Sequence, residues 1–143
     1  MSDYIMQMRP LFEKEEKDAI CKYMDEDGFI TEFKRTEKFE QLIADFTETK
    51  HCVVVNNGTV ALSLAAIASG IKSGDEVIVP NYTMIATPNS LQMFGAQPVF
   101  VDIEPETLCI DISLIEKAIT KKTKGIVFVS ANGRYPKSGI KAF

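Results

Sequence analysis

The stretch of this sequence best suited to chemistry is a polar turn between an apolar run and a helical pattern. Three valines at 53–55 lead into Asn56-Asn57-Gly58-Thr59, and an apolar segment follows. The first N–H groups of a helix lack partners within it, and the helix dipole favours an anion there. Gly58 allows close approach of the backbone, and the Thr59 hydroxyl adds a donor. The turn is a candidate phosphate site, or else Asn57 or Thr59 simply caps the helix.

A second candidate lies in residues 79–89, which follow another apolar run and contain Tyr82 and Met84. In parallel α/β sheets ligands bind beyond the carboxyl ends of the strands, so these two side chains could lie against a flat ring. The alternative makes Tyr82 a half-buried loop aromatic and Met84 a core filler. Asp102 ends the next apolar run in a comparable place, although an Asp there usually serves a turn.

These candidates are placed by a pattern of alternating strands and helices. Short runs rich in Val and Ile, bounded by Gly, Pro, Asn or Asp, predict strands at 52–55, 76–79, 98–102 and 125–129. Apolar residues at helical spacing predict helices at 13–26, 37–47, 59–69, 86–94 and 113–119. Ser113 and Glu116 have the spacing of a capping box at the last of these helices. The order favours an α/β fold with right-handed crossovers.

Composition excludes several classes of protein. The net charge is −4 in 143 residues, whereas a nucleic-acid surface requires clustered Lys and Arg. No apolar run reaches the roughly 18 residues of a membrane span, and the first residues lack the order of a signal peptide. Three widely spaced cysteines and a single histidine form no metal cluster. We therefore expect a cytoplasmic protein that binds neither nucleic acid nor membrane.

Five segments in order resemble the DegT/StrS-type family of pyridoxal-phosphate (PLP) sugar aminotransferases. Each reproduces a short family motif built around Gly, Thr, Pro or Asp at fixed spacing. The segments are Gly28-Phe29-Ile30-Thr31, Asn57-Gly58-Thr59-Val60-Ala61-Leu62, Gly74-Asp75-Glu76-Val77-Ile78-Val79-Pro80, Tyr82-Thr83-Met84-Ile85-Ala86-Thr87, and Gly95-Ala96-Gln97-Pro98-Val99-Phe100-Val101-Asp102-Ile103.

The resemblance implies a three-layer α/β fold with a mostly parallel sheet flanked by helices, an incomplete large domain of a fold-type-I PLP enzyme. Residues 1–50 would form an N-terminal helical segment and 51–143 a partial PLP-binding domain. Asn57, Gly58 and Thr59 would bind the cofactor phosphate, and Tyr82 and Met84 would lie near its ring.

The resemblance also implies that Thr31 faces the substrate. Family members move an amino group, typically from glutamate, to a keto group on a nucleotide-linked sugar, usually as homodimers and often for polysaccharide biosynthesis. The keto-deoxysugars linked to GDP or dTDP are the expected acceptors.

The family's Schiff-base lysine and the acidic partner of the pyridine nitrogen lie beyond the point that matches Phe143. Lys72, Lys124 and Lys137 occupy segments unlike the lysine motif, so we expect no catalytic lysine in these residues. Two other interpretations stay open. One is a non-catalytic truncated paralogue that binds phosphate, PLP or a protein partner, and the other is a generic nucleotide-binding α/β domain.

Overall fold

The computed structural model describes residues 8–26 and 34–137, so the predicted substrate residue Thr31 lies outside the described residues. The chain divides into two compact units, Met1–Val54 and Val55–Phe143. The first unit carries helices α1 (Lys14–Asp25) and α2 (Lys34–Thr47). Arg35 connects residues of this unit, because its guanidinium lies 2.9 Å from a Glu26 carboxylate oxygen and 5.4 Å from the centre of the Tyr23 ring.

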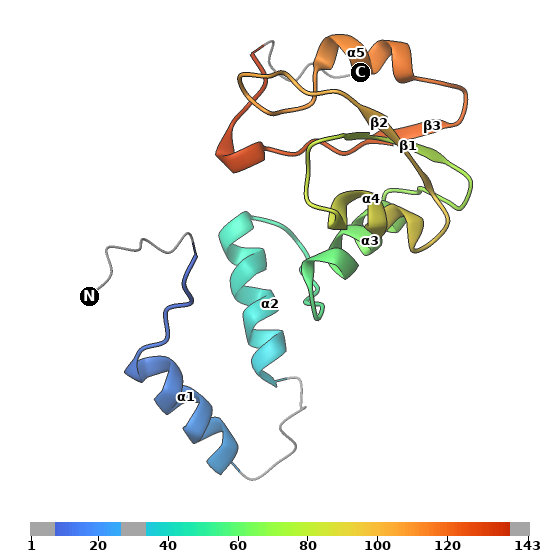
Figure 1. Ribbon diagram of the computed structural model, residues 1–143. Coiled ribbons are helices and arrows are strands. Elements are labelled where there is room, and N and C mark those ends of the chain that lie inside the picture. The colour runs from blue at the N-terminus through green and yellow to red at the C-terminus, as the bar shows by residue number, and fades with distance from the viewer. Residues whose placement is uncertain (1–7, 27–33, 138–143) are drawn as a thin grey trace. The chain divides into compact units, whose positions relative to one another are not determined.

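The second unit is an α/β sheet with helices on both faces (Figure 1). Its helices are α3 (Gly58–Ala68), α4 (Ala86–Gln92) and α5 (Ile112–Ala118), and a 3₁₀ turn, η1, spans Ala131–Gly133. Its strands are β1 (Glu76–Pro80), β2 (Gln97–Val101) and β3 (Thr123–Ile126). The strands are parallel in the order β2-β1-β3, which places β1 in the centre.

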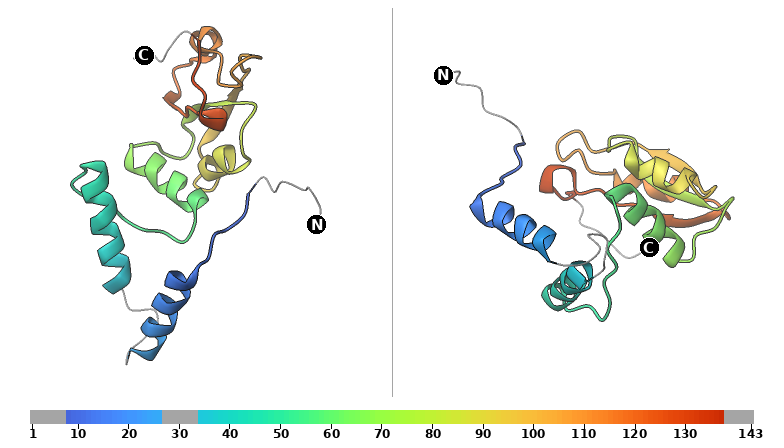
Figure 2. Two further views of the ribbon diagram at one scale, coloured as in Figure 1. Left: turned by 90° about the vertical axis from the view of Figure 1, so that its left-hand side faces the viewer. Right: turned by 90° about the horizontal axis from the view of Figure 1, so that it is seen from below.

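The core lies on both faces of β1 because successive side chains of a strand point to opposite sides. Val77 and Val79 pack with Leu91 of α4 on one face, and Ile78 packs with Ile115 of α5 on the other. Figures 1 and 2 show α3 and α4 on one side of the sheet and α5 on the other. The predicted three-layer α/β fold with a parallel sheet is therefore confirmed.

The strand predicted at 52–55 is wrong, because these residues have no regular secondary structure. A strand needs a neighbour for its backbone groups, and none of β1, β2 and β3 pairs with this segment. The amide of Val54 instead donates to a carboxylate oxygen of Glu40 at 2.7 Å. The side chain of Val53 is 76% exposed, as expected for a segment outside the sheet.

The capping box predicted at Ser113 is also wrong. Helix α5 begins one residue earlier, and Asp111 caps it by accepting hydrogen bonds from the Ser113 amide at 2.9 Å and the Ser113 hydroxyl at 2.6 Å. Only one residue can occupy the N-cap position of a helix. Asp111, whose carboxylate is a strong cap, occupies it here, and Ser113 therefore lies within the first turn.

Candidate functional site

The polar turn before α3 is capped by its own asparagine. The side-chain oxygen of Asn57 accepts from the Val60 amide at 3.0 Å, and its carbonyl accepts from the Ala61 amide at 3.1 Å. The interpretation of Asn57 as a helix cap therefore describes its contacts. Its side-chain oxygen is occupied by this bond, which leaves the residues after it to face a ligand.

Two amides at the same helix start have no partner in the described part of the chain. Among the described residues, no acceptor pairs with the N–H groups of Gly58 and Thr59 or with the Thr59 hydroxyl. A Cβ built on Gly58 would meet nothing within 4 Å, so the backbone is open to an approaching group. Since α3 is 11 residues long, its dipole adds positive potential at this point. The geometry fits a phosphate.

The loop between β1 and α4 is held at both ends by hydrogen bonds. The Asn81 amide donates to Val101 at 2.9 Å, and the Asn81 side chain donates to the Asp102 carboxylate at 2.8 Å. The hydroxyls of Thr83 and Thr87 lie 2.9 Å apart. Asp102 thus positions the loop through Asn81, which is the turn role expected for an Asp at a strand end.

Tyr82 and Met84 line a pocket at the carboxyl ends of β1 and β3. It has a volume of about 440 Å³ and is formed by residues 82–84 and 129–132. Met84 is 77% exposed, so it is not the core filler of the alternative interpretation, whereas Tyr82 is 52% exposed, which agrees with the half-buried loop aromatic of that interpretation. Ser130 and Asn132, which sequence reasoning did not propose as site residues, lie in the same pocket. In the sequence, the Asn132-Gly133 dipeptide is typical of a turn and indicates a loop at this place.

The polar turn before α3 and this pocket are separate features of the second unit. Residues 57–59 do not line the pocket. A hydrogen bond nevertheless joins α3, which begins at the turn, to α4, which follows the loop of Tyr82 and Met84. In this bond the Ser63 hydroxyl of α3 donates to the Ser90 carbonyl of α4 at 2.8 Å. The buried Ser63 also bonds the Thr59 carbonyl at 3.2 Å, which ties the helix start to this contact.

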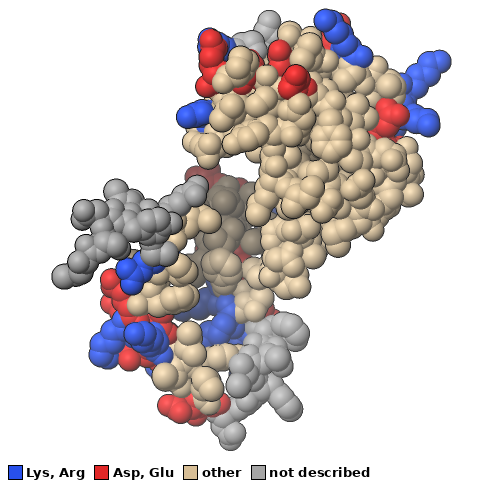
Figure 3. Space-filling model, in the orientation of Figure 1, with Lys and Arg blue, Asp and Glu red and all other residues tan. Residues whose placement is uncertain are grey.

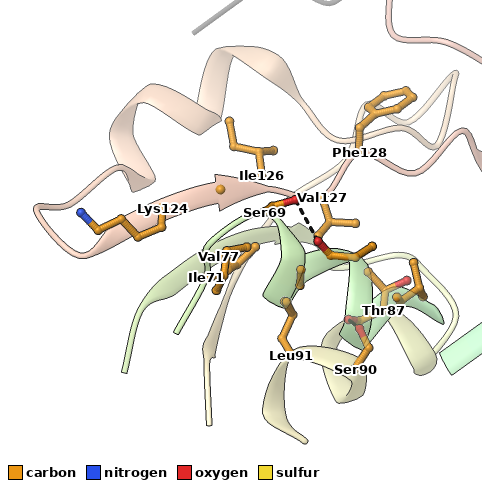
Figure 4. A pocket seen from close by; sticks show the side chains of 14 residues that line it. Ser69, Ile71, Val77, Thr87, Ser90, Leu91, Lys124, Ile126, Val127 and Phe128 are labelled. Atoms are coloured by element: carbon orange, nitrogen blue, oxygen red, sulfur yellow. Dashed lines mark hydrogen bonds between the residues drawn. The ribbon is translucent and has the colours of Figure 1, made fainter. Parts of the chain in front are cut away.

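A second hollow lies on the α3 and α4 side of the sheet (Figure 4). It has a volume of about 450 Å³, and its lining is largely apolar, with Val77, Leu91 and Val127 among its residues. Lys124 is at its edge. The hydroxyls of Ser69, Thr87 and Ser90 in its lining are already hydrogen-bonded within the protein, so they do not offer the free polar groups that fix a cofactor in place.

The surface around these helices is uncharged. Neither α3 nor α4 contains a charged residue, and Figure 3 shows a broad area without Lys, Arg, Asp or Glu on the second unit. Of the lysines considered above, Lys124 lies at the edge of the hollow, and Lys137 forms an ion pair with Glu106. Within the described residues no group of His, Cys, Asp and Glu could hold a metal ion, and no helix is long and apolar enough to cross a membrane.

Relatives of known activity resemble most of this chain. GDP-perosamine synthase of Caulobacter vibrioides is 41% identical over 125 residues, which are 87% of this chain and 34% of that protein. UDP-2-acetamido-2-deoxy-3-oxo-D-glucuronate aminotransferase of Pseudomonas aeruginosa is 44% identical over 97 residues, which are 68% of this chain and 27% of that protein. The chain thus spans about a third of its relatives' length or less.

A solved structure shares the fold. GDP-4-keto-6-deoxymannose-3-dehydratase with a trapped PLP-glutamate geminal diamine matches with a TM-score of 0.70 and 32% identity, over 82% of this chain and 32% of that chain. A match to one family covers residues 10–137. The chain therefore belongs to the DegT/DnrJ/EryC1/StrS aminotransferase family, whose solved members bind pyridoxal phosphate, and the family predicted from the five motifs is confirmed.

Proposed function

We propose that this chain is the amino-terminal part of a PLP-dependent aminotransferase that moves an amino group, from glutamate, to a keto-deoxysugar linked to a nucleotide. The observation that carries the proposal is the pair of free amides on Gly58 and Thr59 at the start of α3. They lie in the unit that also holds the pocket of Tyr82 and Met84, at the strand ends where α/β folds bind ligands.

The residues of this chain would hold the cofactor. The amides of Gly58 and Thr59 and the Thr59 hydroxyl would bind its phosphate, with Asn57 keeping the turn in place as the helix cap. The Tyr82 ring and the polarizable Met84 thioether would lie against the flat ring. Thr31 is proposed on the substrate side. When bound, PLP supplies an electron sink for amino transfer.

The rest of the site is proposed to come from the remainder of the protein. We propose that the lysine that holds the cofactor and the acidic partner of the ring nitrogen lie outside these 143 residues, and that the working form is a cytoplasmic homodimer. The acceptor nucleotide is proposed to be GDP or dTDP. The GDP-perosamine synthase relative, 41% identical to this chain, supports testing GDP first.

An amino-transfer assay tests the proposal. The protein expressed from its longest natural reading frame is incubated with PLP, L-glutamate and a GDP-linked 4-keto-6-deoxyhexose. We expect 2-oxoglutarate to form in equal amount to an amino sugar detected by mass spectrometry. Without the keto sugar, at most about one equivalent per bound cofactor should form, because the amino group of glutamate then stays on the cofactor. A protein that binds PLP but forms no 2-oxoglutarate with GDP-, dTDP- or UDP-linked keto sugars would be the non-catalytic paralogue instead.

A further inference from the structure

The turn that follows β3 holds an asparagine in an uncommon backbone conformation. Asn132 has φ 52° and ψ 34°, in the left-handed region that residues with a side chain adopt rarely and that Asn tolerates better than most. Non-glycine residues in this region occur often at ligand sites, where the surrounding structure holds them in place.

The surrounding contacts fix this turn firmly. The Ser130 hydroxyl donates to the Arg134 carbonyl at 2.7 Å, and the thiol of buried Cys109 donates to the same oxygen at 3.3 Å. The Gly133 amide donates to the Ser130 carbonyl at 3.1 Å, and Ala131 is buried beneath. Three hydrogen bonds and the burial of Ala131 therefore define the backbone on either side of Asn132, whereas Asn132 itself is exposed.

Asn132 lines the pocket that is also lined by Tyr82 and Met84. No charged side chain lines this pocket within the described residues, which makes it unsuitable for a phosphate or a carboxylate. In the described part of the chain the Asn132 amide group has no hydrogen-bond partner. An amide both donates and accepts, so it matches a hydroxyl, and Tyr82, whose ring is largely apolar, lines the same pocket.

We propose that Asn132 binds a hydroxyl group carried by a ring that occupies this pocket. The inference rests on the proposed function, under which two rings with hydroxyls are present. One is the pyridine ring of the cofactor, and the other is the sugar of the nucleotide-linked acceptor. The chemistry of recognition is the same for both, and separate binding measurements distinguish them.

The test variant is Asn132→Gly, which removes the amide and keeps the left-handed backbone because glycine adopts positive φ freely. Asn132→Asp is the second variant, since it keeps the shape and loses the donor. Glu48→Gly is the matched control, because Glu48 has φ 54° and belongs to the first unit. All are made in the protein expressed from its longest natural reading frame, and thermal unfolding confirms that each is folded.

Two dissociation constants are measured, one for PLP by absorbance titration and one for GDP-mannose by calorimetry, with KM and kcat for the keto sugar beside them. Loss of one such hydrogen bond weakens binding about 5- to 30-fold. If the cofactor is the partner, Asn132→Gly raises the dissociation constant of PLP and shifts the absorption spectrum of bound PLP. If the sugar is the partner, PLP binding is unchanged, while the KM and the GDP-mannose dissociation constant rise with little change in kcat.

Equal values for wild type, Asn132→Gly and Glu48→Gly in both titrations would overturn the inference and leave the proposed function intact. A wild-type protein that binds neither PLP nor GDP-mannose would overturn the proposed function and this inference with it. Weaker binding of both PLP and GDP-mannose by Glu48→Gly would also contradict the inference, because the effect would then not come from the Asn132 side-chain amide.

Discussion

At the residue scale, the four leading amides of α3 divide into two pairs. Val60 and Ala61 donate to Asn57, while Gly58 and Thr59 have no acceptor among the described residues. The cap and the anion site were alternatives when only the sequence was considered. The two are compatible, because the Asn57 side chain caps only the Val60 amide and Ala61 makes the ordinary first helical bond, which leaves the Gly58 and Thr59 amides for an anion.

Gly58→Ala separates ligand binding from helix stability. Alanine forms helices better than glycine by about 0.5–1 kcal/mol, and no atom lies within 4 Å of the added Cβ, so the thermal midpoint should hold or rise. The methyl group would nevertheless occupy the open space beside the free amides. We expect PLP affinity, measured by absorbance titration, to fall about tenfold, which is the cost of weakening one charge-assisted hydrogen bond. Unchanged affinity would place the phosphate elsewhere.

At the element scale, the sheet depends on two turns that meet at the amino ends of β1 and β2. Gly95, with φ 88°, accepts a hydrogen bond from the Gly74 amide at 2.9 Å through its carbonyl. A Cβ on Gly95 would lie 2.4 Å from the Ser73 hydroxyl oxygen and 3.1 Å from its Cβ. Gly95 is therefore required both by its backbone conformation and by the closeness of the neighbouring turn.

Gly95→Ala should lower the free energy of unfolding by about 2–4 kcal/mol, from left-handed strain of about 1–2 kcal/mol and the contact with Ser73. Gly70→Ala is the matched control, because Gly70 has φ 89° but nothing within 4 Å of its added Cβ. Urea unfolding of both variants measures the difference. Equal losses would mean that Ser73 moves aside without cost.

Helix α1 begins with a pH-sensitive contact. The Glu13 amide donates to a Glu16 carboxylate oxygen at 2.8 Å, and this bond, with a second from the backbone of Glu16, lowers the pKa of Glu16 below its usual 4.5. Because the pKa of Glu16 is lower in the folded protein than in the unfolded chain, this contact stabilises the fold above pH 4.5. That stabilisation is lost as the pH falls through the pKa of the folded state. The Glu13 amide proton shift should therefore titrate with a midpoint below 4.5, and Glu16→Gln should abolish that transition. A midpoint at or above 4.5 would contradict the contact.

The sequence predicts the helices and the strands β1, β2 and β3 to within a few residues, because each pattern is bounded by Gly, Pro or Asp. The same pattern at 52–55 forms no strand, since pairing depends on a neighbour rather than on local composition. Asn132 was missed for a related reason. Asn132 and Tyr82 line one pocket because β1 and β3 are neighbours in the sheet, and the periodicity of apolar residues does not predict the order of strands in a sheet.

At the scale of the whole molecule, the second unit leaves apolar surface uncovered. Helix α3 is apolar on almost every side, yet Leu64 and Ile67 are each 47% exposed. A helix of this kind is normally buried on all faces. The hollow in Figure 4, lined by Val77, Leu91 and Val127, adds to this surface. We expect further protein, from the same polypeptide or a second copy, to cover it.

Residues 1–143 expressed alone should therefore bind a hydrophobic dye such as ANS and associate in sedimentation experiments. The protein from the longest natural reading frame should do neither beyond a defined dimer. A 143-residue chain that stays monomeric, unfolds cooperatively and ignores the dye would support the self-sufficient binding module instead.

The most direct test of the account is borohydride reduction of that longer protein after incubation with PLP. We predict a visible absorption band from bound cofactor, its irreversible loss on reduction, and a labelled lysine located by peptide mapping outside residues 1–143. Attachment to Lys72, Lys124 or Lys137, or a protein that retains no cofactor at all, would contradict the account.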